Sequence, residues 1–228
     1  MTTRDADEYV VRFSFWSRFQ HASVILLFGL LVVTGLPQKW PYNDVSRWLI
    51  DAMGGIFATR WIHRAVGVAF AVLVVAHLSV VIVGLLTGKM KPSMFLGRKD
   101  FQDAILNLKY YMGYADSPPR FGRYDYRQKF EYWGLIFGSA VMVATGFLLM
   151  YPIAVSLALP AELIPAAKVM HSAEALFAFL IVLIWHMAGA HLSPEAFPLD
   201  TSIFTGKIRK EKLKHEHPLE YDDLFPKP

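Results

Sequence analysis

The sequence HSAEALFAFLIVLIWH, residues 171–186, is an apolar stretch that begins and ends with a histidine. Of the fourteen residues between His171 and His186, only Glu174 is charged. As an α-helix the stretch rises about 22 Å, which is most of the hydrocarbon thickness of a bilayer. Fifteen steps of about 100° bring the second imidazole to within about 60° of the first, so both rings face one side of the helix at two depths. Because a histidine inside a membrane is costly, each ring is expected to have a partner.

The sequence HRAVGVAFAVLVVAH, residues 63–77, repeats this arrangement. His63 and His77 lie fourteen residues apart, which is an angular offset of about 40°. Two apolar helices with histidines near both membrane faces predict two stacked haem groups, each with two axial histidines. An alternative is a histidine-lined transmembrane metal or proton transporter, because imidazoles also bind zinc or copper and relay protons. A transporter would gather its ligands at one depth, whereas these histidines are about 21 Å apart along apolar helices.

The composition is typical of an integral membrane protein. Hydrophobic residues make up 54% of the chain, charged residues make up 18%, and the mean hydropathy is +0.34. The absence of cysteine excludes disulfides, iron–sulfur ligation and covalent c-type haem, so any haem is haem b and any iron–sulfur chemistry belongs to another subunit. The net charge of +4 gives no reason to expect nucleic acid as a partner, and membrane lipid is the expected surrounding.

The hydropathy pattern predicts an all-α fold, an integral membrane four-helix bundle. The predicted spans are residues 15–36, 61–86, 132–151 and 167–190. Two further helices are expected in the connections, a short surface helix at about 45–53 and an amphipathic helix at about 100–113. Three parts follow from this pattern: a polar tail 1–14, a membrane domain 15–193 and a polar tail 194–228.

The distribution of lysine and arginine predicts the orientation of the chain. Three lie in or next to the N-terminal tail when Arg18 at the head of the first span is included, nine in the 87–130 connection and six in the C-terminal tail. The other two connections hold five when Arg64 and Lys168 at the heads of the second and fourth spans are included. Basic residues gather on the cytoplasmic side of membrane proteins. We therefore expect a multi-pass protein of the inner (cytoplasmic) membrane with both termini in the cytoplasm.

This orientation sorts the histidines by depth. Two lie at the outer level, His63 and His171, and three at the inner level, His77, His186 and also His21, which enters the membrane on the first span. The charged C-terminal tail contains two more that are expected to be solvated, His215 and His217.

Four segments carry a resemblance to a known family: RFQHASVILLFGLLVVTG (18–35), WIHRAVG (61–67), RQKFEYWG (127–134) and VMHSAEA with IWHM (169–187). Together they resemble the four-helix cytochrome b subunit of respiratory formate dehydrogenases and the related b-type cytochromes of membrane-bound hydrogenases. The resemblance extends over residues 12–190, and the histidines are its specific part.

The resemblance implies two b haems and electron exchange with membrane quinone, menaquinone or ubiquinone. Its ligand pairs are His21 with His186 on the inner haem and His63 with His171 on the outer haem. It places Gln128 and Lys129 of RQKFEYW in the quinone pocket beside the inner haem. The implied role is the electron-transfer subunit of an oxidoreductase complex, whose partner carries iron–sulfur clusters or several haems.

His77 departs from that family pattern. The fourteen- and fifteen-residue spacings are instead similar to those of the cytochrome b of bc-type quinol–cytochrome c oxidoreductases, where two middle helices supply all four ligands. That pattern would pair His77 with His186. Three inner-level histidines then compete for two axial positions, and either His21 or His77 is left over or serves a third haem.

Overall fold

The computed structural model describes residues 8–192, 196–197 and 199–226. The chain forms two compact units. The helical unit comprises Phe19–Val83 and Leu135–Asp200, and the terminal unit comprises Met1–Arg18, Gly84–Gly134 and Thr201–Pro228. The predicted domain boundary between residues 193 and 194 lies outside the described residues, as does the first half of the predicted N-terminal tail.

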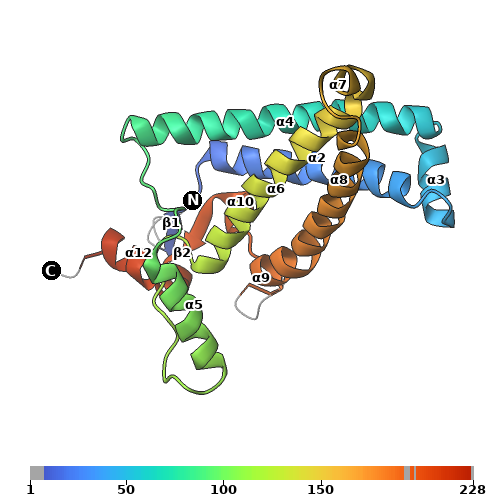
Figure 1. Cartoon of the computed structure of the whole chain (residues 1–228). Coiled ribbons are helices and arrows are strands. Elements are labelled where there is room, and N and C mark those ends of the chain that lie inside the picture. The colour runs from blue at the N-terminus through green and yellow to red at the C-terminus, as the bar shows by residue number, and fades with distance from the viewer. Residues whose placement is uncertain (1–7, 193–195, 198, 227–228) are drawn as a thin grey trace. The chain divides into compact units, whose positions relative to one another are not determined.

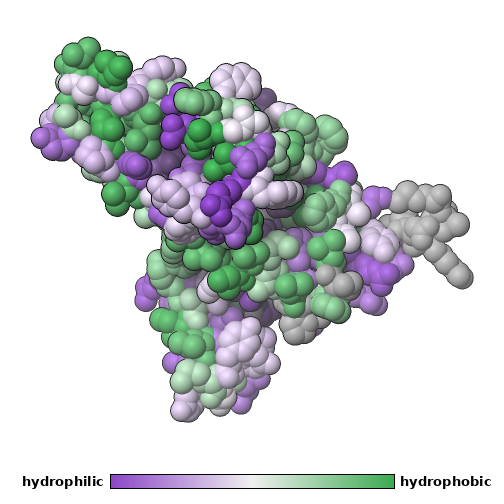
Figure 2. Space-filling view, turned by 90° about the vertical axis from the view of Figure 1, so that its right-hand side faces the viewer, coloured by the Kyte–Doolittle hydropathy of each residue, from purple (hydrophilic) through white to green (hydrophobic). Residues whose placement is uncertain are grey.

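Four helical runs in the described part of the chain are long and apolar enough to cross a membrane. They are α2 (Phe15–Lys39), α4 (Ile56–Leu86), α6 (Tyr126–Met150) and Leu163–His191, which joins α8 (Leu163–Leu180), η1 (Ile181–His186) and α9 (Met187–His191) (Figure 1). Few of their apolar side chains are buried inside the protein, and hydrophobic residues lie widely exposed on the surface (Figure 2). Such helices need lipid around them, so the predicted four-span helical membrane fold is confirmed.

α2 and α4 lie side by side in opposite directions (Figure 1). The hydroxyl of Thr34 contacts His63 at one end of the pair, and Gln20 contacts His77 at the other. The sequence predicted that the first span ends at Leu36, but α2 continues through Pro37 to Lys39. Pro37 has no N–H to donate along the helix, and the side-chain amide of Gln38 donates to the Thr34 carbonyl at 2.8 Å in this last turn.

Both helices predicted in the connections are present. α3 (Asp44–Ala52) starts at Asn43, whose side chain accepts a hydrogen bond from the Ser46 amide at 2.9 Å. α5 (Arg98–Tyr111) starts where the Gly97 amide donates to the Asp100 carboxylate at 2.8 Å. A further short helix, α7 (Pro152–Ala158), connects α6 to α8.

The fourth membrane run changes its helix type at η1, which is a π-helix. A π-turn closes i→i+5 hydrogen bonds and so holds one residue more than an α-turn. The fifteen residues from His171 to His186 therefore turn through about the angle of fourteen α-helical residues, which is the spacing of His63 and His77. The regular helix assumed for the angle of about 60° is interrupted at η1; the register shift brings the offset to about 40°, so both rings still face one side.

In the terminal unit, a strand from early in the sequence pairs with a strand from late in the sequence. β1 (Tyr9–Val11) pairs antiparallel with β2 (Lys207–Arg209), with Val10 opposite Ile208. α10 (Ser202–Thr205) ends at Gly206, whose φ of 81° is left-handed and whose carbonyl accepts the Arg12 amide at 2.8 Å. A Cβ at Gly206 would lie 2.8 Å from the Phe13 carbonyl oxygen, so only glycine fits this turn. α11 (Lys210–Glu216) and α12 (Pro218–Leu224) complete the unit.

A buried ionic network connects three segments of the terminal unit. The carboxylate of Glu220 on α12 pairs with Arg12 and, at 2.6 Å, with Arg123. Arg123 also donates to the Arg12 carbonyl at 2.6 Å, and Arg12 donates to the Arg123 carbonyl at 2.7 Å. Because the charges are paired and hydrogen-bonded, they are tolerated away from water, and removing one partner would be costly.

His217 lies in this network and is only 6% exposed, so the expectation that it is solvated is wrong. Its Nδ1 donates to the Gly122 carbonyl at 2.6 Å, and its Nε2 accepts from Arg12 at 3.0 Å. The second contact requires a neutral ring, because a protonated ring cannot accept at Nε2. Burial lowers the pKa of His217 from 6.5 to about 4, and the positive charge of Arg12 acts in the same direction.

We predict that acid destabilises the terminal unit through His217. Between pH 6.5 and about 4 the unfolded segment binds a proton that the folded ring does not, so stability falls as the pH drops through this window. The loss at the lower end is on the order of 3 kcal/mol. Hydrogen exchange of the α11–α12 amides at pH 7, 6 and 5 measures this loss of stability.

His217→Asn keeps a donor for the Gly122 carbonyl but cannot titrate, so it should flatten the pH dependence. His215→Asn is the matched control, since His215 is exposed on α11, two residues before His217. Equal pH slopes in wild type and His217→Asn would contradict the assignment.

Candidate haem-binding site

The helical unit brings the two outer-level histidines face to face. His63 projects from α4 and His171 from α8, with ring centroids 6.3 Å apart and ring planes at 82°. Both rings are half-buried. The two helices therefore present one imidazole each to a shared space.

A second pair forms at the inner level. His21 of α2 and His186 of η1 also have ring centroids 6.3 Å apart, with ring planes at 44°. His191, at the end of α9, is buried, and its ring centroid lies 6.1 Å from that of His186, edge to face. Along the fourth run the two levels are about 20 Å apart.

The distance in both pairs fits one metal atom between two imidazoles. A metal–imidazole bond is about 2.0–2.1 Å long and the ring centre lies about 1.1 Å behind the bonded nitrogen, so two ligands on one metal have centroids about 6.3 Å apart. The observed separation is 6.3 Å at both levels. The residues therefore fit a bis-histidine haem at each level.

Two threonines that the sequence analysis did not select contact the outer pair. Thr34 of α2 lies 2.8 Å from Nδ1 of His63, and Thr145 of α6 lies 2.9 Å from Nδ1 of His171. With Nδ1 engaged, the Nε2 atom of each ring is the one available to a metal. A sequence signal exists, because each threonine is followed by glycine in the similar stretches VVTG (32–35) and VATG (143–146).

His77 has a different neighbour. Its Nδ1 lies 3.2 Å from Oε1 of Gln20, one residue before His21 on α2. His77 is half-buried, like the other four intramembrane histidines. The structure thus places His21 opposite His186, the pair that the family resemblance implies, and places His77 beside Gln20.

Gln128 and Lys129 lie at the start of α6 in the terminal unit. The Gln128 side chain accepts from the Asp125 amide at 3.2 Å, and the Asp125 carboxylate accepts from the Gln128 amide at 2.9 Å. This is a reciprocal helix cap. Lys129 forms an ion pair with Asp100 of α5 at 2.8 Å. Both residues therefore have a structural role, and the quinone role stays a prediction.

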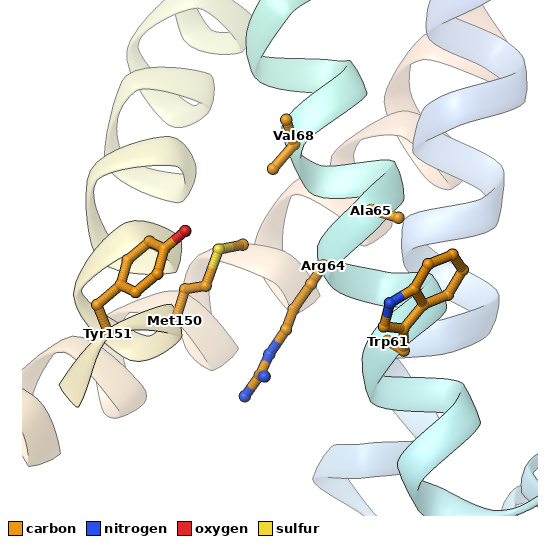
Figure 3. Close-up of a pocket in the computed structure, with 6 residues that line it drawn as sticks. All are labelled: Trp61, Arg64, Ala65, Val68, Met150 and Tyr151. Carbon is orange, nitrogen blue, oxygen red and sulfur yellow. The ribbon is translucent and has the colours of Figure 1, made fainter. Parts of the chain in front are cut away.

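A pocket of about 330 Å³ opens on another face of α4 (Figure 3). Its lining consists of Trp61, Arg64, Ala65 and Val68 of α4 and of Met150 and Tyr151 at the end of α6. By helix geometry this face of α4 points away from His63. Arginine and aromatic side chains together are typical of the membrane–water interface, so we assign the pocket to the interface and not to the histidine pairs.

Four apolar helical runs, three of which hold facing histidines, define the class of protein: a multi-pass membrane protein of the b-type cytochrome kind. The family model described as prokaryotic cytochrome b561 matches residues 12–199, so the chain belongs to that family. The family binds haem b and transfers electrons in the membrane, which confirms the resemblance to a membrane b-type cytochrome. No curated protein matches the sequence.

We predict that each haem depends on its own pair of histidines. Replacing His63 or His171 by alanine should remove one component of the reduced α-band and keep the other, because the second pair is about 20 Å away. His186→Ala and His21→Ala should remove the other component, and His77→Ala should keep both. Difference spectra of the purified variants measure this.

His215→Ala, in the terminal unit, is the control for loss through general instability. If His77→Ala loses a component that His21→Ala retains, the inner pair is His77 with His186. Retention of both components in His171→Ala would refute the outer pair.

Proposed function

We propose that this chain is the di-haem subunit of a membrane-bound oxidoreductase complex and passes electrons between a redox partner and the quinone pool. The observation that supports the proposal is the pair of imidazole sites, each with a ring separation of 6.3 Å, at two levels of one helical unit. Two sites stacked in this way give electrons a route between the two faces of the membrane.

The side chains of the chain determine what the sites can do. His63 with His171, and His21 with His186, would fill both axial positions at each level. Haem b supplies one-electron exchange at its iron when it is bound. With two imidazoles in place no coordination position is open to a substrate, so the sites suit electron transfer and not oxygen or peroxide chemistry.

The redox partner is proposed on compositional grounds. The chain contains no cysteine and therefore has no ligands for an iron–sulfur cluster. We propose a partner that carries iron–sulfur clusters or several haems, as in the formate dehydrogenase and hydrogenase complexes that the sequence resembles. The basic residues of both tails and of the 87–130 connection support an inner-membrane location with both termini in the cytoplasm.

We place quinone at the N-terminal end of α6, on the basis of the RQKFEYW segment. Gln128 is exposed there, and its Oε1 already accepts the Asp125 amide, so its NH2 group is the part suited to a quinone carbonyl. Quinone reduction consumes protons, and in this proposal Lys129 helps to supply one. The ion pair with Asp100 holds the Lys129 side chain at this helix end.

No observation favours the transporter alternative. A metal pathway needs three or more ligands in one place. Within the described ranges, no group of three histidine, cysteine or acidic side chains is arranged to hold a metal ion. Four of the histidines lie in two opposed pairs, which suits haem ligation.

We predict that Gln128→Glu slows quinol-driven haem reduction several-fold and weakens inhibition by a quinone-site inhibitor. Glutamate keeps the oxygen that caps α6 but lacks the NH2 donor, so the variant separates quinone binding from helix capping. Stopped-flow absorbance of the α-band, at normal haem content, measures the rate.

Gln102→Glu is the matched control, because Gln102 is exposed on α5. A normal rate and normal inhibition in Gln128→Glu would remove Gln128 from the quinone site. If quinol does not reduce the haem of the wild-type protein, the proposed exchange with the quinone pool is wrong.

A further inference from the structure

We propose that two Thr-Gly pairs, Thr34–Gly35 of α2 and Thr145–Gly146 of α6, position the two imidazoles of the outer site and lower the reduction potential of the haem held there. The inference rests on the proposed haem-binding function. It concerns side chains that are not themselves ligands and that come from the two helices without an outer-level histidine.

The first pair engages His63. The Thr34 hydroxyl lies 2.7 Å from the Leu30 carbonyl oxygen of its own helix and 2.8 Å from Nδ1 of His63. Thr34 is only 1% exposed, so water does not compete for these contacts. The threonine thus bridges its own backbone and the ring of the neighbouring helix.

The second pair engages His171 in the same way. The Thr145 hydroxyl lies 2.6 Å from the Val141 carbonyl oxygen and 2.9 Å from Nδ1 of His171. Thr145 is 6% exposed. Two different helices therefore use the same dipeptide, at the same ring atom, on the two opposed imidazoles of one site.

The proton count determines the direction of these hydrogen bonds. A hydroxyl has one proton, and in both threonines it is donated to the carbonyl four residues earlier in the helix, an oxygen that can only accept. The hydroxyl oxygen then accepts from Nδ1–H of the histidine. This fixes the tautomer in which Nε2 has a free lone pair, as a metal ligand requires.

The glycines provide room for the same two rings. A Cβ at Gly35 would lie 3.0 Å from Cε1 of His63, and a Cβ at Gly146 would lie 3.3 Å from Cε1 of His171. Both distances are tighter than ordinary van der Waals contact, and each ring lies against both the glycine and the neighbouring threonine. A larger residue at either position would require the imidazole to shift.

Intramembrane threonines commonly donate a hydrogen bond to a carbonyl of their own helix, and this chain contains such a threonine. Thr59 of α4 is fully buried and donates to the Gly55 carbonyl at 2.9 Å. It follows the ordinary intrahelical pattern without a histidine at its oxygen. Thr34 and Thr145 add the contact with an imidazole, and this contact is the basis of the proposal.

The expected electronic effect follows from the hydrogen bond. An acceptor at Nδ1–H makes the imidazole a stronger electron donor to the metal, which favours the ferric state and lowers the reduction potential. Two such acceptors act on one iron. Removing either should raise the potential of the outer haem, and removing both should raise it further.

The test is a spectroelectrochemical titration of Thr34→Val, Thr145→Val and the double variant. The outer component is the one that His63→Ala lacks. We expect its midpoint potential to shift upward in each single variant, by about the sum in the double variant, with an altered low-spin ferric EPR signal. The inner component should not move, and Thr34→Ser and Thr145→Ser, which keep the hydroxyl, should retain the wild-type potential.

Thr59→Val is the matched control and should leave both potentials unchanged. Gly35→Ala and Gly146→Ala should lower the occupancy of the outer haem, whereas Gly29→Ala on α2 and Gly134→Ala on α6 should not, since no atom lies within 4 Å of a Cβ at either position. These occupancies provide a second readout if a valine variant binds no outer haem.

The outcomes separate this inference from the proposed function. A wild-type protein without haem would overturn the proposed function. Haem bound normally, with an unchanged outer potential in the double valine variant or with normal occupancy in both outer glycine variants, would overturn the role of the Thr-Gly pairs alone.

Discussion

The structure depends on giving each nitrogen of an intramembrane imidazole a hydrogen-bonding partner or a metal. A histidine ring has two nitrogens, and in hydrocarbon each needs a partner because no water is available. At the outer level Nδ1 of His63 and His171 is met by threonine, and the two rings face each other across 6.3 Å. The Nε2 atom of each ring remains available, and two imidazoles at this separation fit a bis-histidine haem.

Other features of the helical unit make this arrangement possible. α2 and α4 run in opposite directions, and α2 extends over both levels. It contributes Thr34 at the outer level and His21 at the inner level. The π-helix η1 shifts the register of His186 relative to His171 by one residue, and π-segments in helices frequently occur at functional sites. The lipid-facing helix surfaces stay apolar and exposed, so the polar atoms are concentrated between the helices.

Hydropathy alone predicted the four spans, because a helix in lipid must be apolar over its length. The spacing of His171 and His186 predicted two depths, but a periodicity argument assumes a regular helix and so could not find η1. Thr145 was missed because its span has no histidine, and its partner is on another helix. The burial of His217 depends on Arg12, which is distant in sequence, and no local pattern reports such a contact. The sequence thus specified which elements exist, whereas the contacts between distant elements needed the structure.

The central claim is that the helical unit holds two haems, one between each pair of imidazoles. The most direct measurement is the haem content of the purified full-length protein by the pyridine haemochrome method, combined with acid–acetone extraction. The account predicts about two haems per polypeptide, all of them extractable, because two bis-histidine sites exist and the chain has no cysteine for covalent attachment. One haem per polypeptide, or none, would contradict it.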